Sequence, residues 1–317
     1  MVSLADVRAA AERVRPFIVR TALERSLGLS ALCGTDVWLK YECFQATGSF
    51  KLRGALNALL TMSDQQRQKG VLTASAGNHG LGVARAAAVL GVAATVVVPE
   101  TASPAKIERL RASGAELLLR GATYDDAESA AISLATERRL PFISAYNDAA
   151  VVAGGGTIAL EVIEDLPSTR TMVVPAGGGG LISGIGVAAH GLDPAIAVYG
   201  AQSTASPALH AALEAGARVP VDVLPSLADG LSGNVEDGSI TFDLLKEHVR
   251  EVVLVTESDI VHAMRWLLEH EHVLVEGSAA VGVAALLRGL LPTDGPLVLV
   301  LTGRNVAAEV LRQYVLA

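Results

Sequence analysis

Short apolar runs recur along the chain, and longer stretches with helical spacing of their apolar residues separate most of them. The runs are rich in Val, Leu and Ile without polar alternation, which is typical of parallel strands covered by helices on both faces. Helices that connect such strands form βαβ units, so the pattern predicts a doubly wound α/β architecture. We expect strands at residues 37–41, 71–74, 94–98, 116–119, 142–144, 172–174, 197–201, 252–255 and 297–301.

The four expected strands between residues 71 and 144 form a self-contained group with three helical crossovers. Nine strands are many for one compact sheet, and 317 residues suit two domains of about 150 residues each. We therefore predict a large domain of residues 1–60 and 150–317 and a small domain of residues 61–149. Ligands of open α/β sheets bind beyond the carboxyl ends of the strands, so the turns after the strands are the expected functional sites.

Charge and cysteine content exclude several classes of protein. The net charge is -8, and no long run of Lys or Arg is present, which argues against nucleic acid or an anionic membrane surface as a partner. Two cysteines are too few for a disulfide framework, and the first residues lack the apolar run of a secretory signal. We expect a cytoplasmic protein.

Residues 171–192 carry no Asp, Glu, Lys or Arg over a length that could span a bilayer. They also hold seven glycines and Pro175, which would form a poor helix. A buried strand, a glycine turn and a helix fit this stretch better than a membrane span.

Four consecutive glycines, Gly177 to Gly180, follow the apolar run at 172–174 and precede a helical pattern. Such a turn lets the backbone approach an anion closely, and the N–H groups at the start of the next helix bind it, so we predict a phosphate cradle. A turn needed only for tight packing is the alternative. A P-loop is excluded because it needs a lysine directly after the glycines and the next one here is Lys246, and the dinucleotide pattern fits only weakly at residues 154–159.

Lysine is scarce, and Lys51 is the one that lies in a glycine-bearing motif, Thr47-Gly-Ser-Phe-Lys-Leu-Arg-Gly54. Ser49 is expected to be a helix N-cap, which puts Lys51 in the first turn. The positive end of the helix dipole would lower the pKa of the amine there, which suits a nucleophile that forms a Schiff base. A solvated surface lysine is the alternative.

A second glycine-bearing turn, Thr73-Ala-Ser-Ala-Gly-Asn-His-Gly80, follows the expected strand at 71–74. Its N–H groups and polar side chains can hold a carboxylate. A carboxylate site, a phosphate cradle and an imine-forming lysine together indicate an enzyme that uses pyridoxal phosphate on an amino acid. A nucleotide-binding α/β protein without catalytic activity is the alternative from another class.

These motifs make the chain similar to the fold-type II (tryptophan-synthase β-like) pyridoxal-phosphate enzymes. Within that family it resembles the threonine and serine dehydratases (threonine deaminases) and the serine racemases. The resemblance covers nearly the whole chain and implies a cofactor cleft between the two domains. It rests on segments in family order and spacing: Ser49-Phe-Lys-x-Arg-Gly54, Ser75-Ala-Gly-Asn-His-Gly80, Gly154-x-Gly-Thr157 and Gly177 to Gly180.

The resemblance also implies roles for individual residues. Lys51 would be the Schiff-base lysine, Phe50 would lie against the cofactor ring, and Asn78 would hydrogen-bond the 3-hydroxyl. The phosphate would be held by Gly177, Gly178, Gly179 and Gly180. The substrate carboxylate would be bound by the loop that contains Ser75, Gly77 and His79 and closes with the small domain. Thr302 matches the Ser or Thr that faces the pyridine nitrogen.

The sulfur-transferring branch of the family usually shows Ser-x-Lys-Asp-Arg and Ser-Gly-Asn-Thr-Gly, which this chain lacks. We therefore predict a lyase that dehydrates and deaminates L-threonine or L-serine to a 2-oxo acid and ammonia. The alternatives are a serine racemase and a dehydratase of 3-hydroxyaspartate or phenylserine. Racemases carry a Ser where this chain has Ala76, which favours elimination over racemisation.

No metal site is predicted. His270 and His272 point to different sides of a helix, and no third ligand lies near them in the sequence. The metal-binding Glu of animal serine racemases aligns with Gln202, and Ala208 stands where a further acidic ligand is expected. By resemblance the expected partners are a small amino-acid substrate and a second copy of the chain.

Overall fold

The computed structural model describes residues 2–236 and 238–316. The strands are β1 (Leu23–Arg25), β2 (Val37–Lys40), β3 (Val71–Ala74), β4 (Ala94–Val98), β5 (Glu116–Leu119), β6 (Thr171–Pro175), β7 (Ala197–Ser203), β8 (Glu251–Val255) and β9 (Leu297–Val300). The first helices are α1 (Leu4–Val14), α2 (Leu27–Cys33), α3 (Lys51–Thr61), α4 (Asp64–Lys69), α5 (Asn78–Leu90), α6 (Pro104–Ala112) and α7 (Tyr124–Arg138). The later helices are α8 (Ala149–Asp165), α9 (Gly180–Leu192), α10 (Ala208–Ala215), α11 (Thr241–His248), α12 (Glu257–His270), α13 (Gly277–Leu287) and α14 (Ala308–Val310). Short turns of helix are η1 (Arg15–Phe17), η2 (Glu42–Phe44), η3 (Asp229–Leu231) and η4 (Leu311–Val315).

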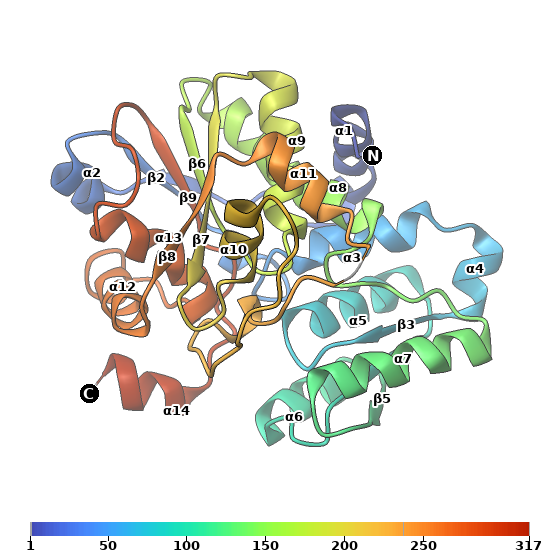
Figure 1. Cartoon of the computed structure of the whole chain (residues 1–317). Helices are drawn as coiled ribbons and strands as arrows, with labels where there is room; N and C mark the ends of the chain where they lie inside the picture. Colours follow the sequence, from blue (N-terminus) through green and yellow to red (C-terminus); the bar gives the residue numbers. More distant parts are fainter. Residues whose placement is uncertain (1, 237, 317) are drawn as a thin grey trace.

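The strands form two sheets (Figure 1). The larger has six strands in the order β1-β2-β9-β6-β7-β8, and the smaller has three in the order β3-β4-β5. Every pairing is parallel except that of β1 with β2, which is antiparallel. The predicted α/β fold class is thus confirmed, with a mixed larger sheet.

Helices cover both faces of the larger sheet. Val173 and Leu299 face a core shared with α12 and α13, whereas Met172 and Val298 face a core shared with α1, α8 and α9. Successive strand residues point to opposite faces, so both neighbours along each strand are apolar. This burial explains the apolar runs of the sequence.

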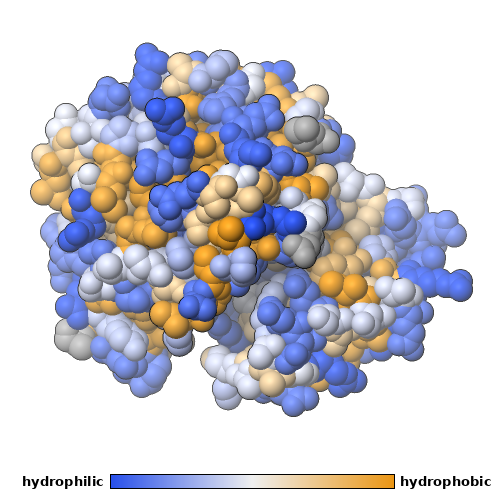
Figure 2. Space-filling model, viewed as in Figure 1, coloured by the Kyte–Doolittle hydropathy of each residue, from blue (hydrophilic) through white to orange (hydrophobic). Residues whose placement is uncertain are grey.

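The smaller sheet is covered in the same way. The Ala-rich face of α7 packs on the side of Leu72 and Val97, while α5 and α6 cover the side of Val96 and Val98. In Figure 1 this sheet and its helices lie beside the larger sheet, and Figure 2 shows the surface hollowed between the two parts at the lower edge of the view. The smaller sheet comes from within residues 61–149 and the larger from the rest of the chain.

Two predictions about strands were wrong. Residues 142–144 form no strand but a single parallel bridge from Phe142 to Leu72, because the Ser144 hydroxyl accepts the N–H groups of Tyr146 and Asn147 and turns the chain away from the sheet. β1 was not predicted at all. It has only three residues, and its exposed Glu24 and Arg25 give no apolar run.

Side-chain caps set where several helices begin. Reciprocal capping boxes start α7 at Thr123 and α12 at Thr256, and the Asp148 carboxylate accepts two N–H groups of α8. Across the described residues, the helices lack the combination of length and apolar character that crossing a membrane requires. Residues 171–192 divide into β6, a glycine turn and α9, as the sequence predicted.

Glycines bring α3, α8 and α9 into backbone contact. A Cβ on Gly154 of α8 would lie 2.6 Å from the carbonyl oxygen of Arg53 and 2.7 Å from the Cα of Gly54 in α3. On the other side of α8, a Cβ on Gly156 would lie 2.5 Å from the carbonyl oxygen of Gly184 in α9. Such distances leave no room for a methyl group, so α3 cannot keep its place if α8 carries larger residues here.

We expect Gly154→Ala to destabilise the protein by about 1–3 kcal/mol, because the new methyl group must push α3 and α8 apart. Gly155→Ala is the matched control in the same helix, since its Cβ would meet Leu181 at 3.4 Å, an ordinary contact. The control should be neutral or more stable by up to about 1 kcal/mol, because Ala favours a helix over Gly. Urea denaturation of both variants measures the difference, and equal stability of the two would contradict the steric argument.

Candidate active site

Lys51 is the first residue of α3, and its side chain is half-buried. Its Nζ donates to the carbonyl oxygen of Ala145 at 2.9 Å. Removal from water lowers the pKa of the Lys51 amine from 10.5 to about 8, and the nearby Glu276 carboxyl opposes that shift in part. The amine is therefore much easier to deprotonate than that of a solvated lysine.

The prediction that Ser49 is the N-cap of α3 was wrong. The capping position is Phe50, which has helical dihedral angles and no side-chain cap. Ser49 instead forms an antiparallel bridge with Gly303, and the Phe50 N–H donates to the carbonyl oxygen of Thr302 at 3.0 Å. The helix can begin only after this pairing ends. The Ser49 hydroxyl is left buried without a hydrogen-bond partner, as a polar group that a ligand can satisfy.

The four glycines form a tight turn between β6 and α9. Gly179 has φ +91°, and a Cβ on Gly178 would lie 2.5 Å from the ring of Tyr146. Side chains are thus excluded by both conformation and space. The turn leaves the backbone at the start of α9 bare, and the N–H groups there favour an anion such as a phosphate.

The loop at residues 75–80 leads from β3 into α5. The Gly77 N–H donates to the Ser75 hydroxyl at 3.1 Å. The Asn78 side chain donates to Glu276 Oε1 at 2.7 Å and accepts from the Asn305 amide at 2.6 Å. The loop thus offers backbone N–H groups and a hydroxyl near the start of a helix, which suits a carboxylate.

His79 is buried, and its Nε2 lies 3.1 Å from the carbonyl oxygen of Ile143. A carbonyl only accepts, so Nε2 carries the proton in the neutral ring and Nδ1 is an acceptor. Burial, together with the charge of Lys51, lowers the pKa of His79 to about 3, which keeps the ring neutral. In this form Nδ1 cannot donate to a carboxylate. That His79 belongs to the loop that binds the substrate carboxylate stays a prediction.

Glu276 is a candidate functional residue that the sequence analysis missed. It is 7% exposed and accepts hydrogen bonds from Asn78 and from the Asn305 N–H at 2.9 Å. Burial raises the pKa of its carboxyl to about 7, with a further contribution from Asp229, while the two hydrogen bonds act in the opposite direction. The sequence feature that could have indicated Glu276 is a single carboxyl residue between the apolar Val275 and a helix of small residues.

Hydrogen bonds and packing contacts connect the predicted site residues into one region. Lys51 contacts the backbone of Ala145, and the next residue, Tyr146, covers Gly178 and Gly180. Thr302, buried after β9, is hydrogen-bonded to Phe50 through its backbone. With the hydrogen bond from Asn305 to Asn78, these contacts join the turns that follow β3, β6 and β9.

The segment in which the resemblance gave no metal ligand makes hydrogen bonds within the chain. Gln202 is fully buried, and its Oε1 accepts the N–H groups of Leu209 and His210 at the start of α10. His270 stacks on Trp266 and its Nδ1 lies 3.0 Å from the Trp266 carbonyl oxygen. The described residues contain no group of three His, Cys, Asp or Glu side chains placed to hold a metal ion.

Comparison with known proteins identifies the family. The sequence model of the family described as "Pyridoxal-phosphate dependent enzyme" matches residues 14–303. The L-threonine ammonia-lyase of Thermotoga maritima is 41% identical over 315 residues, which are 99% of this chain and 78% of that protein. The structure of maize serine racemase has a TM-score of 0.94 at 31% identity and covers 98% of this chain and 96% of that chain. The structure of the T.th. threonine deaminase has a TM-score of 0.90 at 37% identity, covering 96% and 99%.

The fold and these matches define an α/β enzyme with pyridoxal phosphate as its cofactor. The chain belongs to the pyridoxal-phosphate dependent enzyme family. The family resemblance and the cofactor predicted from the motifs are confirmed.

The Glu276 carboxyl should make the stability of the cofactor-free protein depend on pH. Its pKa is about 7 in the folded chain against an ordinary 4.5, so over this interval the folded protein holds a proton that the unfolded chain releases. The stability contributed by this group is full below pH 4.5 and is lost as the pH rises through about 7.

Glu276→Gln removes this titration. We expect the free energy of unfolding of the wild type, minus that of Glu276→Gln, to decrease as the pH rises from about 5 to about 7.5. Urea denaturation of both proteins at the two pH values measures it. A difference that stays constant or increases would contradict the assignment.

Proposed function

We propose that this protein is a pyridoxal-phosphate-dependent ammonia-lyase that converts L-threonine or L-serine into a 2-oxo acid and ammonia in the cytoplasm. The observation that carries the proposal is the half-buried amine of Lys51, whose pKa is lowered to about 8, beside a glycine cradle for phosphate. Its 41% identity over nearly the whole chain to a protein named L-threonine ammonia-lyase supports the substrate class.

Several residues fit the cofactor, and we assign their roles on that basis. The bare backbone at Gly177–Gly180 would hold the phosphate, and Lys51 would hold the aldehyde carbon. Phe50, Asn78 and Thr302 would contact the ring, its 3-hydroxyl and its nitrogen. When bound, pyridoxal phosphate supplies an electron sink for negative charge at the substrate α-carbon.

The remaining steps fall to the residues of the chain. The Ser75 hydroxyl, positioned by the Gly77 N–H that it accepts, and the N–H groups at the start of α5 would bind the substrate carboxylate and so orient the α-hydrogen. The Lys51 amine would take the α-proton, and its lowered pKa favours the uncharged form that a base requires. The β-hydroxyl group then takes up a proton and leaves as water, and hydrolysis of the released enamine by a second water molecule gives the 2-oxo acid and ammonia.

We also propose that residues 61–149 move as a small domain that closes the substrate loop, and that the protein assembles as a dimer. The separate three-stranded sheet supports the first proposal. The second follows from the family resemblance. Dehydration of 3-hydroxyaspartate or phenylserine remains an alternative within the same reaction class, and a keto-acid assay with each amino acid discriminates between them.

Borohydride reduction of the protein loaded with pyridoxal phosphate should fix the cofactor on Lys51. Lys51→Ala should lose the label and lower kcat by about 10²- to 10⁴-fold or more, because it removes both the attachment point and the base. Lys246→Ala, a change at an exposed residue of α11, is the control and should keep both the label on Lys51 and the wild-type kcat. Peptide mapping that finds the label on another lysine would refute the assignment.

A serine racemase is the second candidate, since the maize enzyme has a closely similar fold. Racemisation needs an acid on the face of the substrate opposite Lys51, and the residue that aligns with the racemase Ser is Ala76, whose methyl group carries no acidic proton.

Incubation of the protein with L-serine should therefore give pyruvate with little D-serine, as chiral chromatography can measure. Ala76 is half-buried, so Ala76→Ser should be accommodated and should raise any trace of D-serine. If the wild type forms D-serine as fast as pyruvate, the racemase assignment replaces the dehydratase one.

A further inference from the structure

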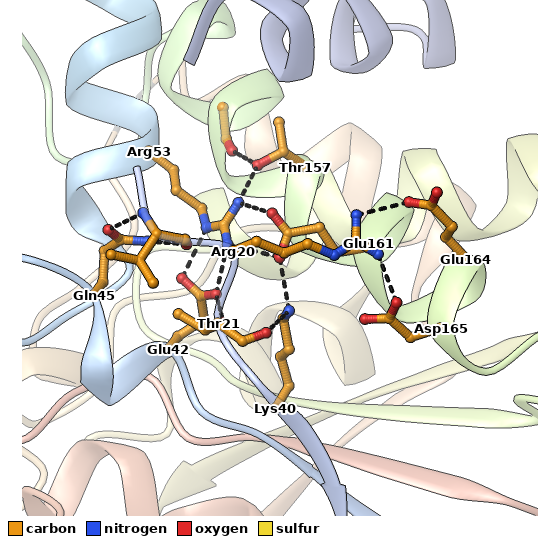
Figure 3. A network of polar contacts seen from close by, with 12 residues as sticks. Arg20, Thr21, Lys40, Glu42, Gln45, Arg53, Thr157, Glu161, Glu164 and Asp165 are labelled. Atoms are coloured by element: carbon orange, nitrogen blue, oxygen red, sulfur yellow. Dashed lines mark hydrogen bonds and ion pairs between the residues drawn. The ribbon is translucent and has the colours of Figure 1, made fainter. Parts of the chain in front are cut away.

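Four charged side chains form a buried cluster beside α3 (Figure 3). Lys40, Glu42 and Arg53 have fully buried side chains, and that of Glu161 is 13% exposed. The two cations balance the two anions. None of these groups has a part in the chemistry proposed above.

Arg53 is the centre of the cluster, and its guanidinium is bound from two directions. Its Nε and Nη2 donate to the two oxygens of Glu42, both at 2.8 Å. Its Nη1 and Nη2 donate to the two oxygens of Glu161 at 2.6 and 2.9 Å, and Nη1 also donates to the Thr157 hydroxyl at 3.2 Å. All five N–H donors of the planar guanidinium fork of Arg53 are therefore used.

The partners of Arg53 come from separate elements. Glu42 lies on η2, two residues after the end of β2, and Glu161 lies on α8. Lys40, at the end of β2, donates to Glu161 Oε2 and to the Thr21 carbonyl oxygen, each at 2.7 Å. The cluster thus ties α3 both to the larger sheet and to the helix that covers it.

Geometry explains what this tie does to Lys51. Lys51 and Arg53 are two residues apart, which is about 200° around a helix, so their side chains leave α3 on opposite sides. A planar guanidinium held by two carboxylates has one orientation. It therefore fixes both the rotation of α3 about its axis and its position along that axis. A Cβ on Gly82 of α5 would lie 3.1 Å from the Lys51 backbone, so α5 packs closely against the first turn of α3.

Stability alone does not account for so many buried charges. The cost of removing ions from water offsets most of their attraction, and apolar side chains of similar volume commonly stabilise a core equally well. What apolar side chains do not provide is a directional contact. A shift of about 1 Å in a reacting group can reduce a rate by about a hundredfold, so the direction of the first turn of α3 has a large effect.

We propose that Arg53 is a positioning residue, whose guanidinium, locked by Glu42 and Glu161, sets the orientation of α3 that aims the Lys51 amine into the site. The inference rests on the proposed function of Lys51. It predicts that weakening the contacts of the Arg53 guanidinium slows cofactor attachment and proton removal by the Lys51 amine. Substrate binding by the loop at 75–79 should stay nearly unchanged.

The experiment compares Arg53→Lys, which keeps the charge and loses the fork, with Lys40→Met. Lys40 belongs to the same cluster but lies on β2 and bonds α8 and Thr21 rather than α3, so its loss should lower the melting temperature without turning α3. Borohydride mapping of the wild type comes first and tests the function of Lys51 separately. The measurements are the rate at which added pyridoxal phosphate attaches to the cofactor-free protein, kcat and KM for L-threonine, and the melting temperature.

We expect Arg53→Lys to lower the attachment rate and kcat by about ten- to a hundredfold while KM changes by less than about threefold. Lys40→Met should lose at least as much in melting temperature and keep the attachment rate and kcat within about twofold of the wild type. If Arg53→Lys does not fold, Glu42→Gln decides instead, because its amide keeps one acceptor oxygen for the fork. The same pattern is expected there with a decrease of about three- to tenfold.

Two results would overturn the proposal while wild-type labelling at Lys51 still supports the function. One is that Arg53→Lys, or Glu42→Gln in its place, keeps both rates within about twofold of the wild type although it is less stable. The other is that Lys40→Met loses as much in both rates as the α3 variant. In either case the cluster acts on stability only. If the wild type is labelled at another lysine, the proposed function fails, and the inference fails with it.

Discussion

The close contact between α3 and α8 is the constraint on which the rest of this structure depends. Gly154 lets α8 touch the backbone of Arg53 and Gly54, and on its opposite side Gly156 lets α8 touch α9. Because α3 begins with Lys51 and α9 begins at the glycine cradle, one helix sets the distance between the two parts of the site. The Arg53 ion cluster adds direction to this contact, which small residues alone cannot give.

Burial shifts the two main titratable groups of the site in opposite directions for one reason. Removal from water favours the neutral form, so it lowers the pKa of the Lys51 amine to about 8 and raises that of the Glu276 carboxyl to about 7. Asn78 bonds both Glu276 and Asn305, so its neutral amide connects the loop at 75–80 to the Glu276 carboxyl. The site therefore contains oriented hydrogen-bonding groups, and burial favours the neutral forms of its titratable groups. Such fixed dipoles can stabilise charge that develops during proton transfer.

Much of the fold follows from the sequence, and the failures have physical causes. β3, β4 and β5 were predicted with their observed bounds because Val and Leu facing both cores give continuous apolar runs. β1 is a polar edge strand, and its existence depends on β2 alone. Ser49 has the composition of an N-cap, but pairing with Gly303, which is distant in the sequence, delays the start of α3.

The sequence by itself determined the α/β class, the glycine turns, and Lys51 as the candidate nucleophile, because each depends on neighbours along the chain. Only the tertiary structure decided the rest. It buried Glu276 against Asn78, laid Tyr146 over Gly178, turned the Nε2 of His79 toward a backbone carbonyl, and surrounded Arg53 with carboxylates from η2 and α8. These contacts join residues far apart in the chain, so their distances and their desolvation exist only once the layers have packed.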